Sequence, residues 1–485
     1  MNKQKRARIF FLFTAALILV AGEIFSQPMD AVLATIGNKQ ITVYNFLQRS
    51  EMTVRPNPFK DKSTTLNNLI TEKILALEVE HNSPLLSNPV FQGRIKGLKE
   101  QAMREELYYT VAFNKTKIDT AELINKFKLS IRDYEVEFYR MHKNLTDKVK
   151  KALESSGGST DEIFKHLTDY AGMQPVRTVT YKDNDNDDVH EALYSKPLNV
   201  GDVIGPLQMD QDDYLIMRVK NWTAHPLLST VDQQTRWEEI KKKEHRIYAQ
   251  KKWENYQRSV MRGKRMDFEG KTFNALAKWV RTRYITEHSK IDSAGFQMPE
   301  IPTHPKEIDL SAPFFKFDGR VWTVDDFRKE LMSHPLVFRT KHIDSSNFSR
   351  QFKLAVVDVM RDHSLTREAY KKKMDKKERV GKVVGMWKDA FIAHDAQKNI
   401  VDKAFKEGKI HRGDQLGINN FWESYVSELQ KKYAGSISIN KKLFENISLT
   451  TVDMFVAKYG VPYPAVVPAF PLFIESKNLE YATRK

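Results

Sequence analysis

The 485-residue sequence contains no cysteine, which excludes disulfide bonds, thiol catalysis and cysteine-ligated zinc or iron–sulfur sites. It also lacks a phosphate-binding Walker A loop, a dinucleotide-binding glycine fingerprint after a strand, and a Gly-x-Ser-x-Gly elbow. Beyond residue 22, no stretch approaches the ~18 apolar residues that a membrane-spanning helix needs. We therefore expect no bound cofactor, and no transmembrane segment after residue 22.

The acidic and histidine-containing segments offer little sign of a metal site. Asp183–Asp188 begins like a calcium-binding loop, but Asp188 stands where such loops carry glycine, and Tyr194 stands where they carry glutamate. His190 and Glu191 resemble the start of a zinc-protease helix, yet the residue four positions after His190 is again Tyr194. We expect an acidic surface turn here and no metal.

Charge, by contrast, is abundant. The chain has 78 Lys and Arg against 62 Asp and Glu, a formal net charge of +16, and 41% of its residues are hydrophobic. These proportions, and a length of about three domains, are typical of a soluble protein with hydrophobic cores. The basic runs Lys241–Lys243 and Lys371–Lys377 lie in predicted helices rich in Glu and Asp, so we interpret them as solvated faces. No nucleic-acid partner is expected, and at most peripheral contact with a membrane.

The first 22 residues are typical of a secretory signal peptide. Basic residues between Lys3 and Arg8 precede a short apolar run, Ile9–Ala21, and Gly22 offers a small residue for cleavage. This run is too short to span a bilayer comfortably. We expect an exported protein; an uncleaved N-terminal anchor is the alternative.

Two parts of the chain share one pattern. Residues 36–46 and 317–327 each read as an apolar strand, a turn with glycine, a short strand and a threonine that can cap a helix. A second match follows in the same order, because Trp253-Glu254-Asn255-Tyr256 resembles Trp422-Glu423-Ser424-Tyr425 and each precedes a basic turn. The repeated order predicts a duplication: two tandem modules of α+β, mostly helical structure.

Residues 131–226 have no counterpart in the second half and read as a small inserted α+β domain. Its closing part resembles a parvulin (PpiC-type) peptidyl-prolyl isomerase domain, on the run Leu198–Leu207 with its glycine and proline, and on the strand Asp213–Val219. The flanking architecture resembles SurA- and PpiD-type periplasmic folding factors, in which such a domain is inserted into a helical chaperone module. The turn at Gly37–Phe46 is typical of that module.

The resemblance divides the chain into seven parts. In order these are a signal peptide (1–22), the N-terminal part of a first chaperone module (28–130), a parvulin-like domain (131–226), the C-terminal helix of the first module (227–281), a linker (282–309), a second module without an insert (310–447) and a tail rich in proline and aromatic residues (448–485).

Active parvulins carry a pair of histidines in their proline pocket, and this sequence departs from that pattern. The last-strand position is Leu215, and the first-strand position falls near Tyr139 or Arg140. Leucine can neither donate nor accept a hydrogen bond, so we expect the domain to lack catalysis while keeping a peptide-binding role. The candidate peptide-binding residues are Met141, Tyr181, Met209, Tyr214 and Met217.

Four prolines in Tyr459–Phe473 preclude a regular helix, while the aromatic content exceeds that of an ordinary disordered tail. The segment either packs in extended form across the protein's own body or occupies a client groove of a module.

Taken together, these features predict an ATP-independent chaperone in the periplasm of a Gram-negative-type bacterium. Its clients would be unfolded envelope proteins, including outer-membrane protein precursors, as the resemblance implies. Two alternatives remain: an active peptidyl-prolyl isomerase, and a structural envelope protein with one fixed partner.

Overall fold

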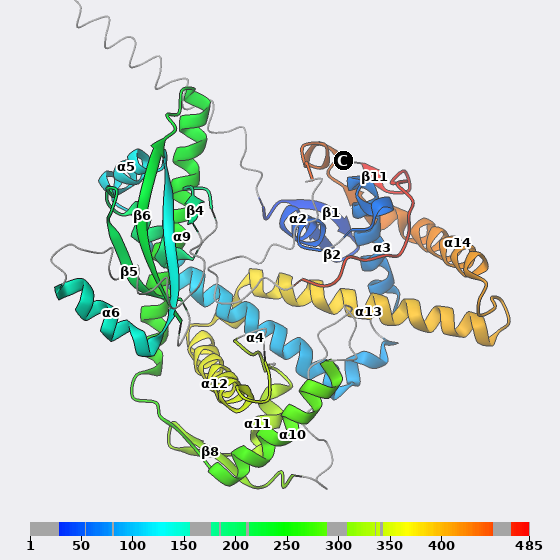
Figure 1. The fold of residues 1–485 in the computed structure, drawn as a ribbon. Helices are drawn as coiled ribbons and strands as arrows, with labels where there is room; N and C mark the ends of the chain where they lie inside the picture. The colour runs from blue at the N-terminus through cyan, green and yellow to red at the C-terminus, as the bar shows by residue number, and fades with distance from the viewer. Residues whose placement is uncertain are drawn as a thin grey trace, which may run out of the picture. The chain divides into compact units, whose positions relative to one another are not determined.

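The computed structural model describes residues 29–53, 55–79, 82–155, 176–183, 186–209, 213–288, 308–334, 336–339, 343–449 and 467–484. The predicted signal peptide lies outside these residues. The chain divides into two compact units, unit 1 (Met1–Leu107 and Val260–Lys485) and unit 2 (Tyr108–Ser259), whose elements are shown in Figure 1. Both units combine many helices with small sheets, so the mostly helical α+β class predicted from the sequence is confirmed. Within the described ranges, no helix is both long and apolar enough to cross a membrane.

One sheet of unit 1 joins the two ends of the chain. Its strand order is β11-β10-β1-β2, with β1 at Val32–Ile36, β2 at Lys39–Thr42, β10 at Ile437–Ile439 and β11 at Thr483–Arg484. β10 is antiparallel to β1, and β11 is parallel to β10. The sheet packs on one hydrophobic core with helices α2 (Val43–Glu51), α3 (Lys62–Val79) and α14 (Gln415–Tyr433).

A second sheet of unit 1 has the order β7-β8-β9 and a core of its own. Its strands are β7 (Met266–Phe268), β8 (Pro313–Phe317) and β9 (Arg320–Thr323), and its helices are α10 (Gly270–His288), α11 (Val324–Leu331) and α12 (Phe348–Lys371). The predicted caps are confirmed in both repeats. Thr42 and Thr323 each accept a hydrogen bond from the main chain three residues later, and Asn45 and Asp326 complete capping boxes.

The tandem grouping predicted from the repeat is wrong in its strand pairing. β10, which follows the helix with Trp422 and Glu423, pairs with β1 of the first hairpin. β7, which follows the helix with Trp253 and Glu254, pairs with β8 of the second hairpin. The pairing of β7 with β8 closes a loop that contains α10, whereas β1 is paired with a strand from the far end of the chain. Each hairpin is therefore paired with the strand from the other copy of the repeat, and residues 28–130 and 227–281 do not form one module together.

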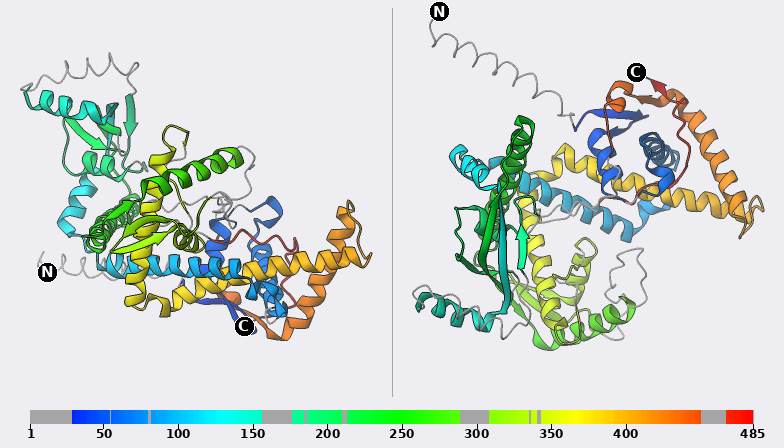
Figure 2. Two further views of the ribbon diagram at one scale, coloured as in Figure 1. Left: turned by 90° about the horizontal axis from the view of Figure 1, so that it is seen from below. Right: turned by 45° about the horizontal axis from the view of Figure 1, so that its top comes forward.

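Long helices connect the two sheets of unit 1. α4 (Pro89–Val111) and α13 (Glu378–Lys406) run antiparallel, as Figure 2 shows, with Phe91 against Phe391 at one end and Glu105 bonded to Arg379 at the other. Asp389 of α13 accepts hydrogen bonds from Lys39 at 2.7 Å and from Lys73 at 2.8 Å. This carboxylate therefore holds α13 against both β2 and α3.

Unit 2 contains the segment that resembles a parvulin. Its four-stranded antiparallel sheet has the order β4-β3-β6-β5. The strands are β3 (Arg132–His142), β4 (Val176–Val179), β5 (Val203–Gln208) and β6 (Asp213–Ala224), and the helices are α5 (Thr120–Leu129), α6 (Lys143–Ser155), α8 (Asp187–Tyr194) and α9 (Thr230–Met261). These elements agree with the α+β character expected for residues 131–226; residues 156–175 lie outside the described residues.

Candidate peptide-binding surfaces

The register of β3 against β6 shows which of the two candidate residues of β3 shares a face with Leu215. Leu215 lies directly opposite Arg140, and Tyr139 lies opposite Ile216. Neighbouring residues of a strand point to opposite faces, so Arg140 shares a face with Leu215 and Tyr139 does not. Arg140 is exposed, whereas Leu215 is buried. Neither side chain can both donate and accept hydrogen bonds as a histidine pair would.

The five candidate peptide-binding residues do not form one surface. Met141 and Tyr214 pack on the face covered by α6, in a small cluster with Tyr139. Tyr181, Met209 and Met217 belong to the larger cluster on the opposite face. Tyr181 and Met217 are each only 2% exposed. The alternation of a strand thus separates residues that stand close together in the sequence.

A buried ion pair lies on the α6 face of the sheet. Arg218 of β6 stands opposite Glu137 of β3, and the guanidinium Nη2 lies 2.7 Å from Oε2 of the carboxylate, which is 3% exposed. The hydroxyl of Tyr139 donates to the other carboxylate oxygen at 3.3 Å. These contacts lie within the sheet, so they support the pairing of β3 with β6.

The opposite face, which carries Leu215, is covered by helices. Ile240 of α9, fully buried, belongs to the same hydrophobic cluster as Leu215, Met217 and Tyr181. The helix is held by polar contacts as well, because Arg246 forms a two-bond ion pair with Asp187 of α8. Leu215 therefore packs in the hydrophobic interior of unit 2 together with helix side chains.

A buried polar network holds α9 in this position. Glu244 of α9 accepts a hydrogen bond from the hydroxyl of Tyr181 at 3.0 Å, and its Oε2 lies 3.4 Å from Nζ of Lys126 on α5. His190 of α8 approaches the same carboxylate at 3.6 Å. Burial by itself raises the pKa of Glu244, but His190, Lys126 and Tyr181 together hold this pKa below its ordinary value. The pKa of His190 is lowered by burial, so the neutral imidazole is favoured.

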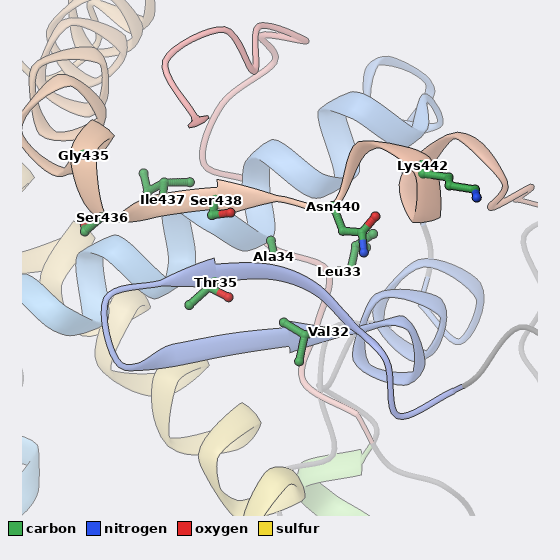
Figure 3. Close-up of a pocket in the computed structure, with 10 residues that line it drawn as sticks. All are labelled: Val32, Leu33, Ala34, Thr35, Gly435, Ser436, Ile437, Ser438, Asn440 and Lys442. Carbon is green, nitrogen blue, oxygen red and sulfur yellow. The ribbon is translucent and has the colours of Figure 1, made fainter. Parts of the chain in front are cut away.

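A hollow in unit 1 lies along the pairing of β1 with β10, and Figure 3 shows its lining. Thr35 and Ser438 face each other across the two strands, and Lys442 supplies one charge at the rim. Hydroxyl groups and a single lysine, with no carboxylate or histidine, offer no general acid or base. Among the described residues, no group of three or more His, Asp or Glu side chains is placed to hold a metal ion.

The C-terminal segment lies in extended form across the first core of unit 1. Phe473 and Ile474 are members of that core, at 3% and 7% exposure, and β11 adds an edge strand beside β10. In Figure 1 this segment is the red chain that passes around α3. The described part of the tail thus packs across the protein's own body; residues 450–466 lie outside the described residues.

The floor beneath the tail contains a buried ion pair. Arg49 of α2 and Glu72 of α3 form two parallel hydrogen bonds of 2.9 and 2.8 Å, and both side chains are at most 1% exposed. The guanidinium also donates to the main-chain oxygen of Ala469 at 2.8 Å. A buried pair of this kind needs every remaining donor satisfied, and the tail supplies one acceptor.

A single side chain of α3 recognises two successive residues of the tail. Oδ1 of Asn68 accepts from the main-chain N–H groups of Phe473 and Ile474 at 2.8 and 3.0 Å, while its Nδ2 donates to the carbonyl of Ile474 at 2.6 Å. Asn67 donates to the carbonyl of Ser476. Both asparagines are fully buried. Neither asparagine was predicted from the sequence; the only signal was the polar pair itself, between Leu66 and Leu69 in a predicted helix.

Aromatic side chains complete this binding surface. Trp422 of α14 donates its indole N–H to the carbonyl of Phe473 at 2.7 Å. The ring of Phe470 packs edge-on against Phe59, with centroids 5.8 Å apart, and the ring of His394 lies 5.2 Å from that of Phe473. The pKa of His394 is lowered, chiefly by burial. We call this surface, made by Arg49, Phe59, Asn67, Asn68, His394 and Trp422, the tail groove.

No protein-family model matches the sequence, and no curated protein matches it. Solved structures similar to the chain include the foldase protein PrsA of Streptococcus pneumoniae str. Canada MDR_19A, with 13% identity over 47% of this chain and 94% of that chain, at a TM-score of 0.20. Foldase PrsA from Lactococcus lactis matches with 13% identity over 47% and 93% of the two chains, at a TM-score of 0.18. TM-scores this low support no inference about the function of this chain.

Proposed function

We propose that this protein is an exported, ATP-independent chaperone that holds unfolded polypeptides in extended form. The observation that supports the proposal is the tail groove, where unit 1 binds an extended apolar segment through hydrogen bonds to its main chain. Main-chain groups are common to all sequences, so a surface of this kind suits many different chains. Burial of apolar side chains adds affinity without direction, and neither contribution requires a nucleotide.

The proposals of export and of client identity rest on the sequence. The N-terminal residues are typical of a signal peptide, and we infer a periplasmic location from them. Unfolded envelope proteins, outer-membrane precursors among them, are the clients that such a location supplies. The basic charge of the chain would favour encounter with acidic unfolded chains.

We infer that the domain resembling a parvulin acts as a binding or spacing element without catalysis. Leu215 and Arg140 replace the histidine pair, and Leu215 is buried in one cluster with Ile240 of α9. A protease-free prolyl cis–trans assay on the full chain tests this inference. We expect no acceleration above the uncatalysed rate, and a measurable acceleration would contradict it.

The decisive experiment for the chaperone proposal is suppression of aggregation. An outer-membrane β-barrel precursor, unfolded in urea, is diluted into buffer without nucleotide, and light scattering is followed with and without the full chain. We expect scattering to fall in proportion to the added chain. No reduction at severalfold excess would reject the proposal, and co-purification of a single stoichiometric partner would favour a structural envelope role instead.

A further inference from the structure

We propose that the tail groove is the client site, that it selects extended segments with paired apolar anchors, and that the C-terminal tail is its intramolecular competitor. This inference rests on the proposed chaperone function and names both the substrate class and the regulation of the site. The anchors are an aromatic residue and, three positions later, an aromatic–aliphatic pair, as in Phe470, Phe473 and Ile474.

The polar contacts of the groove recognise a chain but not its side chains. Arg49 donates to the carbonyl of Ala469, Trp422 donates to that of Phe473, and Asn67 donates to that of Ser476. Asn68 accepts a hydrogen bond from the N–H of Ile474 and donates one to its carbonyl. A different extended segment could make the same bonds with its own main chain.

The apolar contacts define which segments fit. Phe470, Phe473 and Ile474 are 5%, 3% and 7% exposed, whereas Leu472 between them is 49% exposed. Pro471 is buried too, so the groove contacts four of the five positions from 470 to 474 and leaves Leu472 free. Pro471 also lies between the anchors, so a residue without a main-chain N–H is accepted there.

Replacement of the tail by another segment is favoured over an empty groove. If the tail left with nothing in its place, Asn68 and the indole N–H of Trp422 would lose their main-chain partners in a buried setting. An unpaired buried polar group is costly, so an incoming segment that restores the same bonds is favoured over vacancy. The tail belongs to the same chain and so has a high effective concentration, which weakens the binding of every client that must displace it.

The test uses the full chain and a fluorescein-labelled synthetic peptide with the sequence of residues 467–484, followed by fluorescence anisotropy. The double variant Phe473→Ala/Ile474→Ala removes two tail anchors and leaves the groove intact. We expect it to bind the peptide at least about tenfold more tightly than the unaltered chain does, because its own tail competes less well. Leu472→Ala, at the exposed neighbouring position, is the matched control and should bind as the unaltered chain does. Equal affinity of the folded double variant and the unaltered chain would overturn the proposal.

A second measurement keeps the test valid if the double variant does not fold. The same peptide, with a photo-crosslinking residue in place of Phe473, is added in excess to the unaltered chain. Crosslinks within α3 or α14 support the groove as the site, and crosslinks found only elsewhere overturn it.

The failure of this inference can be separated from the failure of the chaperone proposal. Peptide binding at the groove is measured without any client, so it stands even where aggregation is not suppressed, and the chaperone proposal alone would then fail. Where the chain suppresses aggregation, excess peptide should abolish that suppression. Suppression unaffected by saturating peptide would leave the chaperone proposal in place and overturn the assignment of the groove as client site.

Discussion

Each unit of this protein buries an apolar surface beneath another part of the chain, but the two covers are held differently. In unit 2, helix α9 covers the sheet face with Leu215 and is held by contacts between side chains, centred on Glu244 with Tyr181 and Lys126. In unit 1, the extended tail covers the first core and is held by side chains that bond to its main chain, Asn68 above all. Figure 1 shows both covers, α9 in green and the tail in red.

The difference separates a permanent cover from an exchangeable one. Contacts between particular side chains can be satisfied by one sequence only, so α9 belongs to the folded core of its unit. Bonds to main-chain atoms can be satisfied by any extended chain with suitable anchors, so the tail can be replaced. Four experiments test this contrast.

The largest effect is expected at the centre of the α9 contacts. Glu244→Ala removes a fully buried carboxylate that contacts Tyr181, Lys126 and His190. Lys126 keeps Glu191 at 3.2 Å as its remaining ion-pair partner, so the loss should be about 3 kcal/mol. Urea unfolding of the full chain, with hydrogen exchange of α9 as a local readout, measures this loss. Glu238→Ala on the same helix, whose partner Lys241 is also exposed, is the control and should change stability by about 0.5 kcal/mol or less. A loss below about 1 kcal/mol for Glu244→Ala would show that α9 is not held by this network.

The next effect is expected beneath the tail. Asn68→Ala removes three hydrogen bonds to Phe473 and Ile474 and should cost about 2–3 kcal/mol. Because these bonds serve the tail alone, amide exchange at Phe473 and Ile474 should accelerate far more than exchange within α9. Asn399→Ala, which alters an exposed asparagine on α13, is the control. Exchange that accelerates equally in both units would contradict the separate character of the two covers.

Acidification should weaken the α9 cover more than the tail. His190 is 3% exposed beneath α9, and burial lowers its pKa below the ordinary value of 6.5. Below that value the unfolded chain takes up a proton that the folded chain resists, so stability falls as the pH falls, by at most about 1.4 kcal/mol per pH unit. The pKa of His394 is lowered as well, but the side chain is exposed and solvent screens it, so its contribution is smaller. Thermal unfolding between pH 7 and 5 measures the slope, and His190→Gln should reduce it more than His394→Gln does. Stability that rises on acidification over this range would contradict the prediction.

The smallest effect is expected at the surface of the tail. Lys477 lies 3.6 Å from Asp61, and the two side chains are 65% and 40% exposed. Solvent screens such a pair, so Lys477→Ala should change stability by less than about 0.5 kcal/mol. Amide exchange at Phe473 should also stay unchanged. A larger loss would mean that charge, in addition to main-chain contacts, holds the tail.

Local features were predictable from the sequence because they depend on near neighbours. The threonine caps at Thr42 and Thr323 are found, and each follows two short strands joined by a turn with glycine, as the sequence pattern predicts. The pairing of β7 and β10 was not predictable. Each of the two similar strands could pair with either of the two similar hairpins, and only the folded structure shows which pairing forms.

The candidate site was predictable only in part. The resemblance pointed to Leu215, but whether Tyr139 or Arg140 shares a face with it required the register of β3 against β6. The five candidate peptide-binding residues were separated by the two faces of the sheet. Asn68 and Arg49 could not be found at all, because their roles depend on a tail that lies about 400 residues further along the chain.

The absence of cysteine and of nucleotide-binding motifs, the signal-like N-terminus and the repeated strand–turn–helix pattern are properties of the sequence alone, since each follows from composition or from residues close together. Which hairpin receives which strand, which face of the unit 2 sheet α9 covers, and where the tail lies are decided only by tertiary structure. The physical reason is that a buried main-chain or side-chain polar group must find a partner, and in this protein those partners lie far away along the chain.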